Sequence, residues 1–178
     1  MPKDRAVFMD RDGTLVRDVP YCSSPDELEL LPGVPEAIKR LNRGGFKAVV
    51  VTNQSGVGRG YFDVPMLKRI NDKMAADLAK EGARLDGIYY CPHLPEDNCD
   101  CRKPRTALLR KAAADLNLDL SRSFMVGDML SDVVAGQTAG CRTCLVSGLG
   151  TSSVVLLKIK PHQVATSLAE AADWILGQ

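Results

Sequence analysis

The chain alternates between short apolar segments and longer segments whose apolar residues recur at every third or fourth position. The short segments have the length and composition of buried strands, and they predict strands at residues 6–9, 46–52, 85–90, 123–128 and 142–146. The longer segments have the spacing of helices that bury one face, and they predict helices at residues 34–45, 63–82, 106–118, 131–140 and 167–176. Strands separated by helices indicate a mostly parallel sheet covered on both faces. The pattern therefore predicts an α/β fold, a three-layer sandwich of the Rossmann-like type.

Length and composition each exclude a class of protein. A chain of 178 residues without an internal repeat or an evident linker is expected to form a single domain over residues 1–178. A net charge of +1 gives no broad field that would favour nucleic acid or an anionic membrane. The first residues lack the apolar run of a signal peptide, and no segment has the apolar length of a membrane span. We therefore expect a cytoplasmic protein, and the lack of a long apolar stripe favours a monomer.

Polar residues follow three of the predicted strands at the point where each strand ends. Asp10 and Asp12 follow the first strand, a Thr–Asn pair at 52–53 ends the second, and Asp128 ends the fourth. The carboxyl ends of parallel strands face one crevice, and the two-residue spacing predicts that Asp10 and Asp12 face it while Arg11 faces away. A single Asp here more often caps a turn, but that role does not explain all three sites. Carboxylates this close must shift their pKa values or bind a cation, and an all-oxygen ligand set with a phosphate nearby favours Mg²⁺.

A Cys- and His-rich loop at residues 91–101 forms a second candidate metal site. Three thiols and one imidazole are the ligand set of a closed, tetrahedral, structural Zn²⁺ site, and the expected ligands are Cys91, His93, Cys99 and Cys101. Free surface thiols and a disulfide are the alternatives, but a disulfide would not need the histidine, and a cytosolic chain disfavours it. The loop ends directly before two cations at 102–103, so the metal is expected to position them.

The remaining cysteines and the second histidine give weaker signals. Cys141 and Cys144 form an isolated C-x-x-C, which we interpret as two small buried residues rather than a redox site. Cys22 has no partner in the sequence and receives no role. His162 follows a proline near the C-terminus and is expected to be structural.

Four motifs resemble, in their order, those of the haloacid dehalogenase (HAD) superfamily of phosphatases, and the resemblance covers essentially the whole chain. The motifs are DRDGT at 10–14, VVVTN at 49–53, the lysine of CRKP at 103 and GDMLSD at 127–132. The resemblance implies a capless fold with an open active site. A receiver domain, which is a non-catalytic phospho-aspartate switch, is the alternative from another class. The acidic pair of a receiver domain is adjacent or nearly so, whereas here one residue separates the two acids. Within the HAD superfamily, the members that transfer phosphate and stop at the aspartyl-phosphate tend to lack an acid at the position of Asp12, so its presence favours turnover.

The resemblance also implies the roles of the matching residues. Asp10 would attack phosphorus and form an aspartyl-phosphate, and Asp12 would act first as general acid and then as general base. Mg²⁺ would be bound by Asp10, by the backbone carbonyl of Asp12 and by Asp128. The residues implied to stabilise the phosphoryl group are Thr52, Arg102 and Lys103. Asp132 is expected to support the site or to cap the following helix.

The zinc loop places the chain beside a small branch of the superfamily. That branch includes enzymes that remove the C7 phosphate of D-glycero-D-manno-heptose 1,7-bisphosphate, for nucleotide-heptose and lipopolysaccharide biosynthesis, and enzymes that hydrolyse histidinol phosphate. The segment TNQSGVGRG at 52–60 resembles the heptose enzymes and favours that substrate. Histidinol phosphate or another small phosphorylated metabolite stays open, because Met129 stands where the heptose enzymes usually have a lysine. The residues expected to bind the substrate are Asp18, Tyr21, Asn53, Gln54, Ser55 and Arg59, although Arg59 could also be a solvated surface charge.

Overall fold

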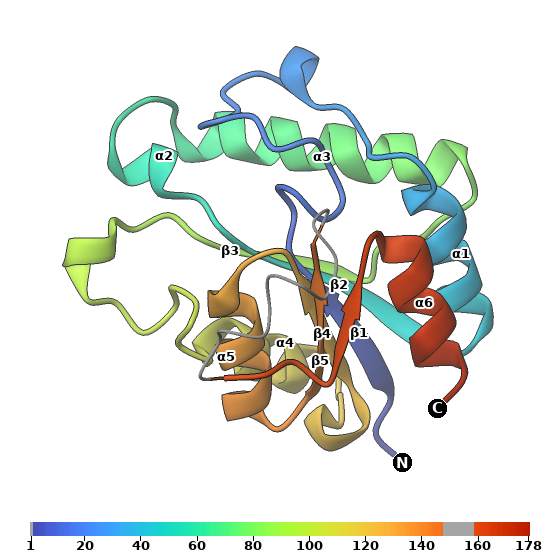
Figure 1. Ribbon diagram of the computed structural model, residues 1–178. Helices are drawn as coiled ribbons and strands as arrows, with labels where there is room; N and C mark the ends of the chain where they lie inside the picture. The colour runs from blue at the N-terminus through green and yellow to red at the C-terminus, as the bar shows by residue number, and fades with distance from the viewer. Residues whose placement is uncertain (1, 148–158) are drawn as a thin grey trace.

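Six parallel strands form one sheet in the computed structural model, which describes residues 2–147 and 159–178 (Figure 1). The strand order is β3-β2-β1-β4-β5-β6, and every pairing is parallel. The strands are β1 (Arg5–Met9), β2 (Phe46–Asn53), β3 (Gly87–Cys91), β4 (Phe124–Gly127), β5 (Arg142–Val146) and β6 (Gln163–Ala165). The α/β prediction is confirmed.

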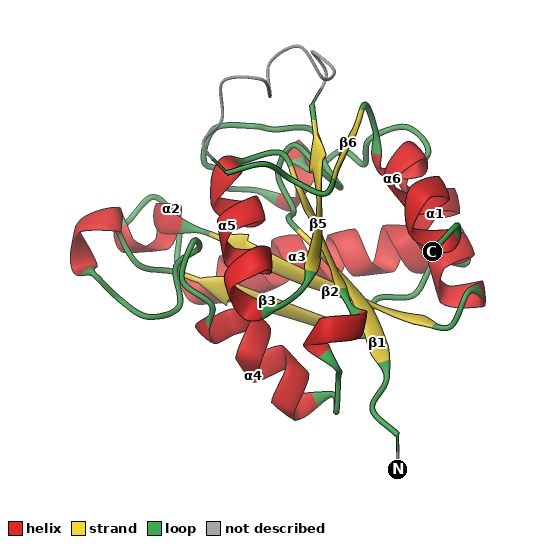
Figure 2. Cartoon of the chain, turned by 60° about the horizontal axis from the view of Figure 1, so that its bottom comes forward, coloured by secondary structure: helices red, strands yellow, loops and turns green. Residues whose placement is uncertain are grey.

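Helices cover both faces of this sheet, so the molecule has three layers (Figure 2). The helices on one face are α1 (Val34–Arg43), α3 (Val64–Lys80) and α6 (Leu168–Leu176). Those on the other face are α4 (Ala107–Asp115) and α5 (Leu130–Ala139). A short helix, α2 (Ser55–Gly58), follows β2, and single 3₁₀ turns lie at Pro25–Glu27, Pro95–Asp97 and Leu120–Arg122.

The central strand β1 shows why its sequence is apolar without alternation. Val7 and Met9 point into the core beneath α1, α3 and α6, whereas Ala6 and Phe8 point into the core beneath α4 and α5. All four are fully buried. A parallel strand with helices on both faces needs apolar residues at every position, which explains the uninterrupted run.

The predicted elements agree with the observed ones to within a few residues, with two omissions. The sequence pattern did not predict β6, which has 3 residues, or α2, which has 4. The helix predicted at 106–118 ends earlier, at Asp115, because Asn117 adopts a left-handed conformation with φ of 52°. Short elements such as these have too few residues to show a period.

The connections place a crevice between β1 and β4. The chain passes from β1 to β2 on one side and later returns to β4 on the other side of β1. Ligands of open α/β sheets bind beyond the carboxyl ends of the strands at such a reversal. Among the residues described, no helix has both the length and the apolar composition needed to cross a membrane.

Candidate active site at the carboxyl ends of the strands

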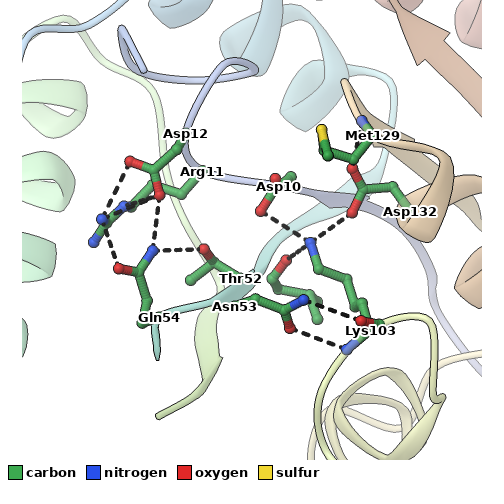
Figure 3. A network of polar contacts seen from close by, with 10 residues as sticks. Asp10, Arg11, Asp12, Thr52, Asn53, Gln54, Lys103, Met129 and Asp132 are labelled. Atoms are coloured by element: carbon green, nitrogen blue, oxygen red, sulfur yellow. Dashed lines mark hydrogen bonds and ion pairs between the residues drawn. The ribbon is translucent and has the colours of Figure 1, made fainter. Parts of the chain in front are cut away.

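A buried lysine lies between an acid that follows β1 and an acid in the first turn of α5. Lys103 comes from the loop after β3, and its Nζ lies 2.9 Å from Asp10 Oδ1 and 2.6 Å from Asp132 Oδ1 (Figure 3). The same Nζ donates a hydrogen bond of 2.7 Å to the carbonyl of Val51. Burial by itself lowers the pKa of Lys103, but Asp10 and Asp132 outweigh burial and raise it above its usual value. Lys103 is therefore a permanent cation beside Asp10.

Asp128 completes a cluster of three carboxylates with Asp10 and Asp132. One oxygen of each lies within 4.8 Å of the others. Burial, together with the nearby charges of Asp10 and Asp132, raises the pKa of Asp128 to about 7. Its Oδ1 is buried and has no hydrogen-bond partner among the described residues. A divalent cation would remove both penalties. Both oxygens of Asp132 are engaged, Oδ1 with Lys103 and Oδ2 with the backbone N–H of Met129, whereas Asp10 pairs with Lys103 through Oδ1. Asp10 and Asp128 are therefore the carboxylates that fit Mg²⁺.

Asp132 holds the start of α5 in place. Its Oδ2 accepts the backbone N–H of Met129 at 3.0 Å, and its side chain is 1% exposed. The expected capping role of Asp132 is confirmed. The side chain of Met129 is uncharged and 58% exposed, so it adds no charge and little packing at this position.

Asp12 lies apart from Asp10, in a second network (Figure 3). Its Oδ2 accepts hydrogen bonds from Gln54 Nε2 at 2.8 Å and from Arg11 Nε at 3.1 Å. Gln54 Nε2 also donates to Thr52 Oγ1 at 2.8 Å. The prediction that Arg11 faces away is wrong, because its guanidinium pairs with Asp12 and is 1% exposed. Strand β1 ends at Met9, and Arg11 begins a turn, so the alternation of a strand no longer applies.

Two residues expected to bind substrate have internal partners. Asn53 Oδ1 accepts the backbone N–H of Lys103 at 3.0 Å, and Asn53 Nδ2 donates to the Lys103 carbonyl at 3.1 Å. Gln54 is 5% exposed, and its amide is shared between Arg11, Asp12 and Thr52. The two Asn53 hydrogen bonds fix β2 to the loop that carries Lys103. A direct substrate contact for either residue stays a prediction.

A pocket of about 340 Å³ opens beside Asp12, and Asp18, Tyr21 and Ser55 line it. The guanidinium of Arg59 lies 5.5 Å from the centre of the Tyr21 ring, at its face. Tyr61, which the sequence did not single out, meets the same ring edge-on at a centroid distance of 4.9 Å. The structure therefore brings Asp18, Tyr21 and Ser55 together around one opening, with Arg59 against the ring of Tyr21. Arg102, which directly precedes Lys103 in the sequence, is partly exposed. Its Nη1 lies 3.5 Å from the carbonyl oxygen of His93.

The four ligand atoms of the expected zinc loop form a compact cluster. Cys101 Sγ lies 3.0 Å from Cys91 Sγ and 3.1 Å from His93 Nδ1, and Cys91 Sγ lies 3.5 Å from Cys99 Sγ. The cysteines are free, so no disulfide forms. Burial and the Cys101 hydrogen bond raise the pKa of the Cys91 thiol well above its usual value, so a thiolate there needs a cation. The cluster fits a tetrahedral metal ion.

Cys141 and Cys144 point into opposite cores of the sheet. Cys141 packs beneath α4 and α5, whereas Cys144 packs beneath α1, α3 and α6. Burial raises the pKa of each thiol to about 12. Two inert thiols on opposite faces cannot act as a redox pair, so the interpretation as small buried residues is confirmed.

A Rossmann-like sheet with acids after β1 and β4 and a buried lysine beside them fits a phosphatase. A family model described as HAD-hydrolase-like matches residues 100–171. The chain belongs to this HAD-like family, among its phosphatases.

Named relatives match almost the whole chain. D-glycero-beta-D-manno-heptose-1,7-bisphosphate 7-phosphatase of Haemophilus ducreyi is 40% identical over 96% of this chain and 98% of its own length. The enzyme of the same name from Helicobacter pylori is 37% identical over 97% of each chain. The crystal structure of D,D-heptose 1,7-bisphosphate phosphatase from B. bronchiseptica, complexed with magnesium and phosphate, superimposes with a TM-score of 0.87. That structure is 38% identical and covers 97% of this chain and 98% of its own.

Proposed function

We propose that this chain removes the 7-phosphate of D-glycero-β-D-manno-heptose 1,7-bisphosphate through an aspartyl-phosphate on Asp10. The observation that carries the proposal is the cluster of Asp10, Asp128 and the permanently charged Lys103 at one crevice. Such a cluster suits a dianionic phosphoryl group with one divalent cation. The substrate is supported by relatives of that name that match the chain nearly end to end.

Asp10 is the proposed nucleophile. One carboxylate oxygen of Asp10 attacks phosphorus, the bond from phosphorus to the C7 oxygen breaks, and the electron pair leaves with that oxygen. Lys103 binds one oxygen of Asp10 at 2.9 Å, so the carboxylate is held in one orientation. Water then attacks the aspartyl-phosphate, and inorganic phosphate leaves.

Asp12 is the proposed acid and base. It gives a proton to the departing sugar oxygen in the first step and takes one from the attacking water in the second. Its side chain is 23% exposed at the pocket beside Asp18 and Tyr21, which is where the leaving sugar would lie.

The charge of the phosphoryl group is balanced by several groups. Mg²⁺ on Asp10 and Asp128, with the backbone carbonyl of Asp12, would neutralise charge between nucleophile and phosphate. The Thr52 hydroxyl and the Lys103 ammonium are proposed to contact the equatorial oxygens, with Arg102 as a forked donor. A structural Zn²⁺ on the 91–101 loop is proposed to hold that loop in place.

A panel of phosphate esters tests this proposal. Phosphate release with Mg²⁺ is measured for both anomers of heptose 1,7-bisphosphate, for histidinol phosphate, fructose 1,6-bisphosphate and p-nitrophenyl phosphate. We expect kcat/KM for the β-heptose bisphosphate to exceed the others by about a hundredfold, through contacts in the transition state that depend on the position of both phosphates and of the sugar hydroxyls. Preference for histidinol phosphate would overturn the substrate, and no release from any ester would overturn the phosphatase chemistry.

Substitution of the nucleophile tests the covalent step. Asp10→Asn should lower kcat by about a thousandfold or more, because an amide cannot form the acyl-phosphate. The variant should stay folded, since Lys103 keeps its 2.6 Å ion pair with Asp132. The matched control is Asp18→Asn, the same change at an exposed acid of the pocket, which should affect KM more than kcat. Undiminished turnover in Asp10→Asn would remove Asp10 as the nucleophile.

A further inference from the structure

The buried guanidinium of Arg11 donates hydrogen bonds to three different side chains. Its Nε and Nη2 bind Asp12 at 3.1 and 3.2 Å, and its Nη2 also donates to Gln54 Oε1 at 2.9 Å. Its Nη1 donates to Asn71 Oδ1 at 3.1 Å. A charge that is 1% exposed must have its donors satisfied, so the positions of these side chains are coupled.

Asn71 is the partner that connects this network to the fold. It lies on α3, is 5% exposed, and sits between Ile70 and Met74, whose side chains are fully buried in the core. The position of its Oδ1 is therefore set by a packed helix. An acceptor fixed in this way determines how the planar guanidinium is rotated, and the rotation determines where Nε and Nη2 meet Asp12.

The result is an asymmetric environment for the two oxygens of Asp12. Oδ2 receives two donors, Gln54 Nε2 at 2.8 Å and Arg11 Nε at 3.1 Å. Oδ1 receives the longer bond of 3.2 Å from Arg11 Nη2. Asp12 lines the pocket of about 340 Å³, so the less occupied oxygen is available to exchange a proton there.

We propose that Asn71 and Arg11 are positioning residues that orient Asp12 for proton transfer, with Asn71 acting entirely through Arg11. The inference rests on the proposed role of Asp12 as general acid. Neither residue needs to touch the substrate. The helix α3, on one face of the sheet, would thereby control a proton transfer at the carboxyl edge of that sheet.

The test compares two leaving groups. An alkyl phosphate such as the heptose ester needs a proton as its oxygen departs, whereas p-nitrophenolate departs without one. Asn71→Leu withdraws the acceptor and should lower kcat/KM for the alkyl ester by about tenfold or more, and for p-nitrophenyl phosphate by less than about threefold. The ratio of the two values does not depend on the fraction of folded protein, so a variant that folds poorly still gives an answer.

Three further variants control this comparison. Asn71→Asp keeps an oxygen acceptor in nearly the same place and should restore most of the alkyl ester activity. Asp72→Asn changes the next residue of α3, an exposed acid paired with Lys68, and should leave both substrates unaffected. In an Asp12→Asn background, Asn71→Leu should cause no further loss, because its effect passes through Asp12.

The outcomes separate this inference from the proposed function. If Asp12→Asn lowers kcat/KM for both esters equally, Asp12 is not the general acid, and both ideas fail. If Asp12→Asn is selective for the alkyl ester but Asn71→Leu affects both esters equally or neither, the inference alone is overturned. A further loss on adding Asn71→Leu to Asp12→Asn would also overturn it.

Discussion

At the scale of single residues, the position of the Asp128 carboxylate requires that residue 13 has no side chain, and that residue is Gly13. Gly13 has a φ of 78°, and a Cβ built there would collide with the carboxylate of Asp128. The turn after β1 and the acid after β4 can approach each other only because this residue is glycine. The close approach places Asp128 beside Asp10 in the proposed Mg²⁺ site.

Gly13→Ala should therefore weaken Mg²⁺ binding as well as the fold. The left-handed backbone conformation should cost about 1 kcal/mol of unfolding free energy, and displacement of Asp128 should raise the Mg²⁺ concentration needed for half-maximal activity. Gly45→Ala is the matched control, since Gly45 has a φ of 80° but no atom within 4 Å of the added Cβ. Thermal denaturation and Mg²⁺ titration of both variants give the answer. Equal Mg²⁺ dependence in the two variants would show that Gly13 has no role at the metal site.

Met129 offers a test of how the chain binds phosphate without a lysine at this position. Its side chain is 58% exposed and directly follows Asp128. Met129→Lys should lower KM for the heptose bisphosphate by about threefold to tenfold, through one added charge near the phosphate, with little change in kcat. Steady-state kinetics at two salt concentrations measure this, because the gain should shrink at high salt. A KM that does not change would mean that position 129 does not face the substrate.

Asp10, Asp12 and Asp128 could be predicted from the sequence, because each follows an apolar strand and parallel strands end at one edge. Lys103 was predicted only from the resemblance of its CRKP segment to a HAD motif. The second network could not be predicted in the same way. The direction of the Arg11 side chain is set by a turn, in which the Arg11 carbonyl accepts the N–H groups of Leu15 and Val16 at 2.9 and 3.0 Å. Its partner Asn71 lies 60 positions away in the sequence. No local pattern carries that information.

At the scale of elements, the loop between β3 and α4 connects the edge of the sheet to its centre. Strand β3 is an edge strand, yet Lys103 reaches the carbonyl of Val51 in the neighbouring strand and the acid after β1. Asn53 holds the Lys103 backbone through two hydrogen bonds. The expected zinc ligands lie at the end of β3 and on this loop, so metal binding there would be coupled to the placement of Lys103.

Removal of one zinc ligand should therefore reduce both metal content and turnover. Cys101→Ser should reduce bound zinc from about one per chain to near zero, lower Tm, and lower kcat by at least about tenfold as Lys103 is displaced. Cys22→Ser is the control, because Cys22 is buried outside the cluster and its Sγ bonds only to the Ser24 carbonyl among the described residues. Elemental analysis, thermal denaturation and kinetics are measured together. Full activity in metal-free protein would exclude a role for zinc.

The sequence predicted the long elements better than the short ones. Helices α1 and α3 show several turns of apolar spacing and could be predicted, and the side chain of Asp63 caps α3 by accepting the N–H of Met66 at 2.8 Å. Strand β6 has 3 residues and gains its position by pairing with β5. Such a strand is defined by its neighbour rather than by its own composition.

At the scale of the whole molecule, the proposed ligands would add contacts between parts of the chain that are far apart in the sequence. The site brings together three residues that are far apart in the sequence, Asp10, Lys103 and Asp128. Two of them are acids and one is a base, all buried or partly buried, so the site carries an excess of negative charge. A cation bound there would relieve the repulsion between the carboxylates in the folded state only, and a bound phosphate would pair with that cation and with Lys103. That the whole chain is one domain stays a prediction.

Binding of Mg²⁺ with inorganic phosphate should therefore raise Tm. At a hundredfold excess over Kd the gain is about 2.7 kcal/mol, or about 5–10 °C for a chain of this size. The shift should be smaller with either ion alone, and Asp128→Asn should largely abolish it. Differential scanning fluorimetry with matched NaCl controls for ionic strength. An equal shift in Asp128→Asn would place the ions elsewhere.

The position of the zinc loop has a consequence for inhibition. The cluster lies beside the edge strand with His93 exposed and Cys101 partly exposed, whereas Lys103 is buried at the catalytic crevice. On the proposals that zinc fills the cluster and that Lys103 binds the phosphoryl group, a chelating or thiol-reactive compound would displace Lys103 without entering the pocket. Such inhibition would develop slowly, would not be relieved by excess substrate, and would be reversed by added zinc in the case of a chelator. The enzyme would thus be open to drug-like molecules at a surface that its substrate never occupies.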